Sequence, residues 1–140
     1  MNSESTGIVP PRVGQPWPGQ GGIYMGIIRG DDGAPDYHLI VGPEADKELN
    51  WKNAMAHAAK VEADGHKDFV LPTRYELALC FANRCELFEK DWYWSSSQGA
   101  DDSSLAWLQG FGFGYQVWLH ESDSSRARVV RRSTFSHLTI

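Results

Sequence analysis

The chain has 140 residues, 41% hydrophobic and 22% charged, which is the composition of one globular domain rather than of a disordered segment. Thirteen Lys and Arg against eighteen Asp and Glu give a formal net charge of -5, which disfavours general binding to nucleic-acid phosphates. No run of about 18 apolar residues is present, and the polar residues 1–6 lack a signal-peptide pattern, so we expect a protein made in the cytoplasm without membrane contact.

The first third of the chain predicts an arm followed by a β-hairpin. Residues 1–16 are rich in Pro, Gly and Ser, and we expect them to form a flexible N-terminal arm. Residues 17–140 are then expected to form a single domain. Two apolar segments, 23–28 and 37–41, flank residues 30–33, whose Gly-Asp-Asp-Gly sequence supplies turn dihedrals.

Helical signals follow in the middle of the chain. Asn50 is a suitable N-cap, and the apolar spacing after it predicts a helix that ends at Asp64-Gly65. Thr73 and the acidic residue three positions later form a capping box, which predicts a second helix. Cys80 and Cys85 both fall on this expected helix, on different sides of it, so we expect two reduced thiols rather than a disulfide.

The last part of the chain predicts strands over residues 92–97, 105–109 and 126–132. Between the last two of these, every odd-numbered residue from Phe111 to Leu119 is apolar, which predicts one long strand with its odd positions inward. Gln116, Trp118 and His120 would then face outward. Because the two helices separate groups of strands without a βαβ repeat, the chain is expected to be an α+β domain with a largely antiparallel sheet.

Five segments occur in the order typical of one known family, and the chain resembles the Lcl C-terminal domain family from about Gly21 to Arg132. They are Gly21-Gly22-Ile23, Leu71-Pro72-Thr73-Arg74-Tyr75-Glu76-Leu77, Tyr93-Trp94-Ser95-Ser96-Ser97, Ala106-Trp107-Leu108-Gln109 and Arg126-Ala127-Arg128-Val129-Val130-Arg131-Arg132. The resemblance implies a C-type-lectin-like fold, in which two helices flank the sheet and the second half of the chain displays the binding surface. It also implies a bacterial protein, often at a cell surface or carried by a phage. More distantly, the pattern is similar to formylglycine-generating enzymes and to the variable proteins of diversity-generating retroelements.

Catalysis and metal binding are not expected. The chain has no Gly-x-Ser-x-Gly elbow beside the serines at 95–97, and its five histidines are scattered. The lectin signatures Glu-Pro-Asn and Trp-Asn-Asp, which would hold calcium, do not occur. Cys80 and Cys85 lie away from the cleft that an oxidase would use. Arg74 could bind an anion at its helix start, but pairing with a nearby carboxylate is the favoured alternative. We therefore expect neither an enzyme nor a cofactor.

The expected binding surface combines the outward face of the long strand with the loops around it. An outward Trp suits either sugar stacking or a protein contact, unless the arm or a neighbouring subunit covers it. Arg126 and Arg128 are included because Arg side chains bind anions well. Arg131 and Arg132 are instead expected to brace the fold through carboxylates such as Glu76. The candidate ligand-binding residues are Trp118, Gln116, His120, Ser97, Gln98, Asp101, Asp102, Arg126 and Arg128.

These features favour a non-catalytic recognition module, encoded by a phage or prophage, that binds a protein or glycan partner. A second interpretation is a structural or assembly subunit of a phage tail or fibre, which would form a homo-oligomer and be associated with the virion. A third is a small acidic inhibitor of a host protein, because the net charge of -5 would attract a basic groove.

Overall fold

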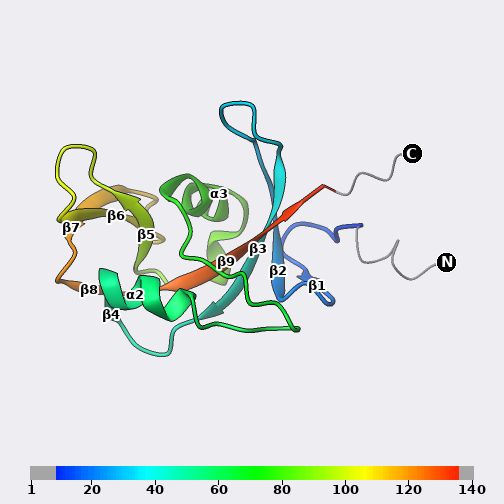
Figure 1. Cartoon of the computed structure of the whole chain (residues 1–140), viewed down its shortest axis with the longest axis horizontal. Coiled ribbons are helices and arrows are strands. Elements are labelled where there is room, and N and C mark those ends of the chain that lie inside the picture. Colours follow the sequence, from blue (N-terminus) through cyan, green and yellow to red (C-terminus); the bar gives the residue numbers. More distant parts are fainter. Residues whose placement is uncertain (1–8, 136–140) are drawn as a thin grey trace.

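The computed structural model describes residues 9–135, which form an α+β fold with mostly antiparallel sheets, as predicted (Figure 1). The strands and helices, in chain order, are β1 (Pro16–Trp17), β2 (Gly22–Ile28), β3 (Tyr37–Glu44), β4 (Leu49–Asn50), α2 (Trp51–Ala58), α3 (Arg74–Arg84), the 3-10 helix η1 (Cys85–Leu87), β5 (Trp92–Gln98), β6 (Leu105–Gly110), β7 (Gln116–His120), β8 (Ser124–Ser125) and β9 (Arg128–Thr134). None of the helices within this range is long and apolar enough to cross a membrane.

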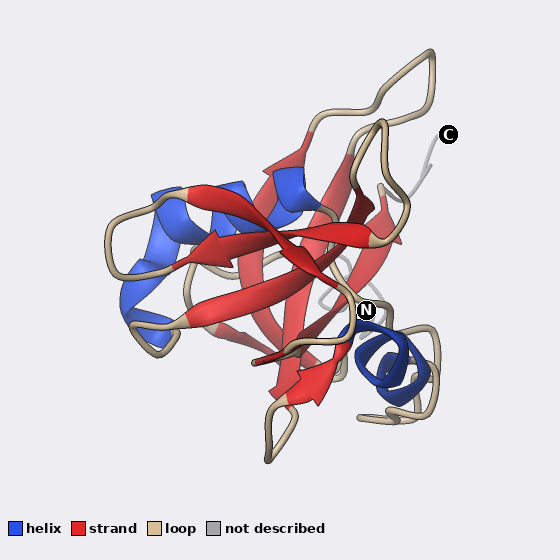
Figure 2. Cartoon of the chain, turned by 90° about the vertical axis from the view of Figure 1, so that its left-hand side faces the viewer, coloured by secondary structure: helices blue, strands red, loops and turns tan. Residues whose placement is uncertain are grey.

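The strands form two main antiparallel sheets and a short two-stranded one. One main sheet has the order β1-β2-β3-β9, and the other has the order β5-β6-β7, while β4 pairs with β8. A parallel bridge between Tyr93 and Arg126 connects β5 to the segment that leads into β9. Helix α3 packs against β2 of the first sheet and against β5 and β6 of the second, and Figure 2 shows the strands and helices from the side. This helix therefore sets the position of the second sheet relative to the first.

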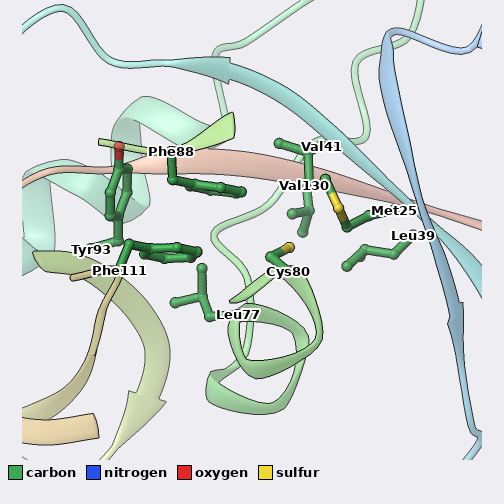
Figure 3. Close-up of a cluster of buried hydrophobic side chains, with 9 residues drawn as sticks. All are labelled: Met25, Leu39, Val41, Leu77, Cys80, Phe88, Tyr93, Phe111 and Val130. Atoms are coloured by element: carbon green, nitrogen blue, oxygen red, sulfur yellow. The ribbon is translucent and has the colours of Figure 1, made fainter. Parts of the chain in front are cut away.

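The main hydrophobic core lies where α3 meets both sheets (Figure 3). Leu77 and Cys80 of α3 are almost fully buried there. The ring of Phe88 stacks on that of Phe111 with centroids 4.1 Å apart, and Tyr93 meets Phe111 edge-on. Both cysteines are free thiols, and burial raises the pKa of Cys80 to about 12, which makes it unreactive filler.

A buried carboxylate joins α3 to the first sheet. Glu76 is fully buried and accepts two hydrogen bonds from Arg132, at 2.7 and 2.9 Å. Tyr37 donates to it at 2.6 Å and the backbone N–H of Thr73 at 2.8 Å, the second being part of the predicted capping box. The prediction that Arg132 braces the fold through Glu76 is confirmed, and Arg131 likewise pairs with Asp68 at 2.7 Å.

The hairpin of β2 and β3 agrees with its prediction, whereas α2 is shorter than predicted. The helix begins after Asn50 as expected but ends at Ala58, rather than continuing to Asp64-Gly65. Asp64 and Gly65 have φ values of 51° and 80°, the two positive values that a type I′ turn requires. They form a tight turn in which Ala63 and His66 exchange backbone hydrogen bonds. The Asp-Gly pair therefore marks a separate turn and not the helix end.

The prediction of one strand over residues 111–119 is wrong. Residues 111–115 form the loop of the β6–β7 hairpin, in which Gly110 donates to the carbonyl of Tyr115 at 2.8 Å. Gly114 adopts a φ of +87°, which permits the chain reversal. Of the odd positions, Phe111 points inward and Leu119 is partly buried against core residues, whereas Phe113 is 86% exposed and Tyr115 and Val117 are also exposed. Among the even positions of β7, Trp118 and His120 are exposed as predicted, whereas Gln116 is only partly exposed.

The predicted arm divides into two parts. Residues 1–8 lie outside the described residues. In the remainder, Gly14 donates to the carbonyl of Tyr24 and Gln15 accepts from the N–H of Tyr24, so this segment runs along β2. Pro16 already belongs to β1, and Trp17 is buried against Tyr24. The part of the arm next to the domain is thus a portion of its first sheet.

Candidate functional site

The three-stranded sheet presents two tryptophans on one face. Trp107 of β6 and Trp118 of β7 occupy directly opposite positions, with ring centroids 5.0 Å apart and planes tilted by 57°. Directly opposite residues of an antiparallel pair bring their side chains together, so the hairpin register creates this contact. Trp118 is 55% exposed and Trp107 is partly buried beneath it. We call these two residues the tryptophan pair.

The beginning of α3 supports the tryptophan pair from one side. The guanidinium carbon of Arg74 lies 3.4 Å from the centroid of the Trp107 ring, a close cation–π contact. The Nε of Arg74 donates to Oε1 of Gln116 at 3.0 Å, and Nε2 of Gln116 donates to the carbonyl of Arg74 at 2.7 Å and to Oε1 of Gln109 at 2.8 Å. Gln116 is therefore a brace between β7 and α3 rather than an open ligand contact.

This arrangement corrects the expectation for Arg74, which was a carboxylate partner. Among residues 9–135 the side-chain partners of Arg74 are the amide of Gln116 and the rings of Trp107 and Tyr75, and it takes part in no ion pair. The reason is that Arg74 is the first residue of α3, and α3 packs against the second sheet, so the side chain reaches Trp107 of β6 and Gln116 of β7. The helix start is already capped by Thr73 and Glu76, and the backbone N–H of Arg74 donates to Oγ of Ser97 at 3.1 Å.

The other predicted residues of the second half lie in the loops at the rim of the same sheet. Nε2 of Gln98 donates to the carbonyl of Ser103 and to Oε2 of Glu121, both at 2.9 Å. This pair of contacts joins the loop after β5 to the turn after β7. His120 is exposed at the end of β7, and its Nδ1 lies 2.8 Å from Oγ of Ser122.

Asp101 and Asp102 are exposed in the β5–β6 loop. Asp102 accepts hydrogen bonds from Oγ and N–H of Ser104, at 2.6 and 2.9 Å. These hydrogen bonds lower the pKa of Asp102, so it stays charged into the acid range. The loop is thus negatively charged and held by its own turn. Within residues 9–135 no group of three His, Cys, Asp or Glu side chains could hold a metal ion.

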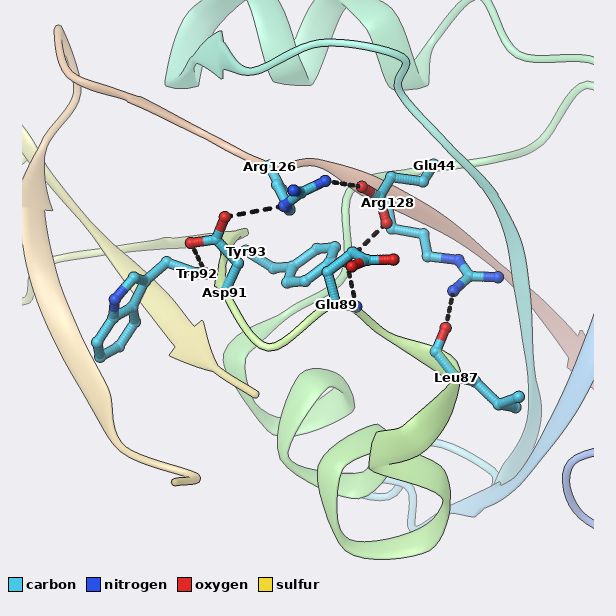
Figure 4. Close-up of polar contacts among 8 residues, drawn as sticks. All are labelled: Glu44, Leu87, Glu89, Asp91, Trp92, Tyr93, Arg126 and Arg128. Carbon is cyan, nitrogen blue, oxygen red and sulfur yellow. Dashed lines mark hydrogen bonds and ion pairs between the residues drawn. The ribbon is translucent and has the colours of Figure 1, made fainter. Parts of the chain in front are cut away.

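Arg126 and Arg128 have their polar contacts with other parts of the fold, near Glu44, Leu87 and Asp91 (Figure 4). Arg126 pairs with Glu44 and Asp91, each at 2.9 Å. Arg128 donates to the carbonyls of Gly42 and Leu87 and lies over the ring of Phe88. Both guanidinium groups therefore bind partners within the fold. The structure does not bring them together with the tryptophan pair.

A further buried polar group sits beside Arg126. The hydroxyl of Tyr93 donates to Glu44 at 2.6 Å and accepts from the backbone N–H of Glu89 at 3.0 Å (Figure 4). Burial and the bond to Glu44 raise the pKa of Tyr93, so its hydroxyl remains a donor at all ordinary pH values. This network connects β3, β5 and the segment before β9, and its role is structural.

The contact between His120 and Ser122 has the residue types of a nucleophile and a base, but its geometry is that of a turn. Nδ1 of His120 also lies 3.2 Å from the backbone N–H of Ser122, which donates to it. The lone pair of Nδ1 is therefore shared between the N–H and the hydroxyl of the same residue, Ser122, as in a local turn. Among the described residues no carboxylate is hydrogen-bonded to the other ring nitrogen, as a catalytic triad would require.

Sequence reasoning missed Trp107 as a member of this surface, and it also missed two exposed aromatic residues elsewhere in the fold, Tyr75 and Phe113. Trp107 was assigned to a strand without an orientation, although its position opposite Trp118 follows once the hairpin loop is placed at residues 111–115. Tyr75 is exposed next to Arg74, and Phe113 stands at the hairpin tip. The signal for Phe113 was its position between two glycines, which is more typical of a loop than of a strand.

The fold and this surface define an α+β domain with a rigid antiparallel sheet and an exposed tryptophan pair. The family model of the Lcl C-terminal domain matches residues 29–131, and the chain belongs to this family. No curated protein matches the chain. The matched region contains the tryptophan pair, Arg74 and both helices.

Proposed function

We propose that this protein is a non-catalytic recognition module that binds a protein or glycan partner through the tryptophan pair. The observation that carries the proposal is the exposure of Trp118 on a face whose other members are held rigidly. A half-exposed Trp ring offers a large contact area at little entropic cost, and such rings dominate binding energies in interfaces. Encoding by a phage or prophage is part of the same proposal and rests on the sequence resemblance.

The rigidity of the site supports this role. Trp107 is held between Trp118 and Arg74, and Arg74 is held by Gln116 and by its place at the start of α3. Because these side chains are already ordered, binding loses little conformational entropy. Polar groups at the rim, including Gln98 and His120, can supply hydrogen bonds that orient a ligand.

The non-catalytic part of the proposal is supported by the state of the reactive groups. Cys80 is buried with a raised pKa, and the partners of His120 are those of a local turn. His38 is buried against Tyr24, and burial lowers its pKa. None of these groups lies in a cleft with a second group that would activate it.

Binding of the purified protein to immobilised glycans and to intact bacterial cells tests the proposal. We expect saturable binding to one of these surfaces, and Trp118→Ala should weaken it by about 30-fold, since a central aromatic contributes about 2 kcal/mol or more. Trp107→Phe should weaken it less. Ile27→Ala is the matched control, because Ile27 is similarly exposed, at 49%, on a strand of the other main sheet.

Equal binding by the wild type and Trp118→Ala, with unchanged circular dichroism spectra, would remove the tryptophan pair as the binding site. Arg126→Ala and Arg128→Ala should lower stability rather than affinity, because both side chains have partners inside the fold. A loss of affinity in these two variants at full stability would instead place the site at the β9 end of the molecule.

A further inference from the structure

We propose that the outer edge of β7 pairs with β7 of a second copy of this chain, in an antiparallel register centred on Trp118. Two three-stranded sheets would thereby join into one of six strands. This inference goes beyond the proposed function and does not depend on which ligand the tryptophan pair binds. It is argued from the hydrogen-bonding pattern, the composition and the exposed area of β7.

The hydrogen bonds of the β6–β7 hairpin determine which backbone groups of β7 face outward. Gly110 donates to the carbonyl of Tyr115, and Glu121 donates to the carbonyl of Ser104. Since hydrogen-bonded pairs alternate along an antiparallel ladder, residues 117 and 119 face β6 and residues 116, 118 and 120 face the free edge. Within residues 9–135 the backbone N–H groups of these three residues have no hydrogen-bond partner.

The spacing of these outward groups is self-complementary. When Trp118 lies opposite Trp118 of the second copy, Gln116 lies opposite His120 in both directions. Each N–H of the free edge then meets a carbonyl of the other edge, where the carbonyl of His120 takes a second hydrogen bond besides the one it accepts from Asp123. The arrangement has two-fold symmetry and uses the same edge of both copies, so it closes at a dimer and does not continue into a fibre.

The composition of β7 also differs from that of protected edge strands. Its sequence Gln-Val-Trp-Leu-His has no Lys, no Pro and no carboxylate, and its pairing with β6 contains no bulge. These are the features that normally prevent edge-to-edge association. The edges of the other main sheet are of the protected kind, since β1 has two residues and begins with Pro16, and the outer edge of β9 is bridged by Val70, which exchanges backbone hydrogen bonds with Val130.

Charge and area determine how strong the contact can be. The register brings no two like charges opposite each other, because residues 116–120 are uncharged and Glu121 falls opposite Tyr115. The exposed parts of Trp118, Tyr115 and Val117 offer on the order of 300 Å² per copy, below the roughly 800 Å² per partner of a standard interface. We therefore expect a weak dimer that depends on concentration. Because each copy has a net charge of -5, added salt should strengthen it.

Pairing in this register would also change the binding face. The side chain of Trp118 would stand beside that of the second copy, and the two tryptophan pairs would form one continuous row across the joined sheet. A single strand edge would thus convert two small sites into one extended surface, which favours long or repetitive ligands over small ones.

Sedimentation velocity of the wild-type chain over a wide concentration range, at low and high salt, tests the pairing. We expect a monomer–dimer equilibrium that shifts toward dimer with salt. Val117→Lys should abolish the dimer, because it places a charge opposite Leu119 of the second copy. The monomer should tolerate this change, because the side chain of Val117 is already 39% exposed there. The matched control is Ile27→Lys, which introduces the same charge at an exposed strand position of the other main sheet and should leave the dimer intact.

A second pair of variants tests the backbone itself. His120→Pro removes an N–H that faces the free edge and breaks no bond to β6, whereas His120→Ala keeps that N–H. We expect weaker dimerisation only for His120→Pro, with circular dichroism confirming that both variants are folded. Val117→Lys should retain ligand binding as a monomer, so failure of the pairing and failure of the proposed function can be told apart.

Three outcomes would overturn the proposal. The first is a wild type that stays monomeric at every concentration and salt level. The second is a dimer that Ile27→Lys disrupts and Val117→Lys does not, which would place the interface on the other main sheet. The third is a monomer whose Trp118 amide becomes protected from hydrogen exchange only when another protein is bound, since β7 would then pair with that protein.

Discussion

The contact between Arg132 and the fully buried Glu76 allows a quantitative prediction about stability. Arg132→Met keeps most of the aliphatic length of the side chain and removes its charge. Glu76 then loses the two hydrogen bonds at 2.7 and 2.9 Å and becomes a buried carboxylate without a cation. We expect a large loss of stability at neutral pH, because the desolvation of a buried charge is no longer offset.

The size of the loss follows from the surroundings. Breaking a fully buried ion pair costs about 3–5 kcal/mol. The side chain of Arg132 is 39% exposed, so water already screens part of its interaction. Tyr37 and the N–H of Thr73 continue to donate to Glu76 after the change. We therefore expect a loss of about 2–3 kcal/mol, which a domain with about 5–15 kcal/mol of stability can survive.

Urea denaturation followed by circular dichroism at several pH values measures this effect. Burial raises the pKa of Glu76, but the hydrogen bonds from Arg132 and Tyr37 outweigh it, so the pKa in the folded wild type is lowered. This contribution to wild-type stability is complete above the ordinary pKa of 4.5 and is lost as the pH falls through the lowered value. In Arg132→Met burial dominates and the pKa of Glu76 rises, so the variant should approach the wild type in stability on acidification.

Two results would refute this reasoning. One is a loss below about 1 kcal/mol at neutral pH, which is the size of an ordinary exposed ion pair. The other is a loss that stays constant between neutral and acid pH, since the charge of Glu76 would then not be its cause. The double variant Glu76→Gln, Arg132→Met is the control, and we expect it to be more stable than Arg132→Met alone.

Three further predictions concern the core, a close approach of two strands and the hairpin tip. Trp94→Ala should cost about 3–5 kcal/mol in urea denaturation, because Trp94 is fully buried and its Nε1 donates to the carbonyl of Leu49. Gly22→Ala should cost about 2 kcal/mol or more in the same assay, because its Cβ would lie 2.0 Å from the carbonyl oxygen of Val41 and would force β2 and β3 apart. Phe113→Ala should change the free energy of unfolding by less than about 0.5 kcal/mol, because the ring is 86% exposed. A larger loss of stability would show that Phe113 is covered in solution.

Local features of the chain were predictable wherever a few neighbouring residues satisfy one another. The capping box of Thr73 and Glu76 forms within one turn of helix, and the Gly-Asp-Asp-Gly turn lies between two strands that pair as predicted. The brace between Arg132 and Glu76 was also predicted, because both residues belong to segments of the family pattern and have opposite charges. Asp64-Gly65 shows the limit, because the same dipeptide suits a helix end and a type I′ turn.

The candidate site depended on contacts that the linear order of residues does not contain. From the sequence alone came an α+β chain, an antiparallel pattern and an outward Trp118. Only the tertiary structure decided that residues 111–115 form a loop, that Trp107 lies opposite Trp118, and that Arg74 stacks on Trp107. The physical reason is that a strand's inward face is defined by what covers it. Here α3 covers part of the sheet from more than 30 residues away along the chain, as the bond between Arg74 and Gln116 shows.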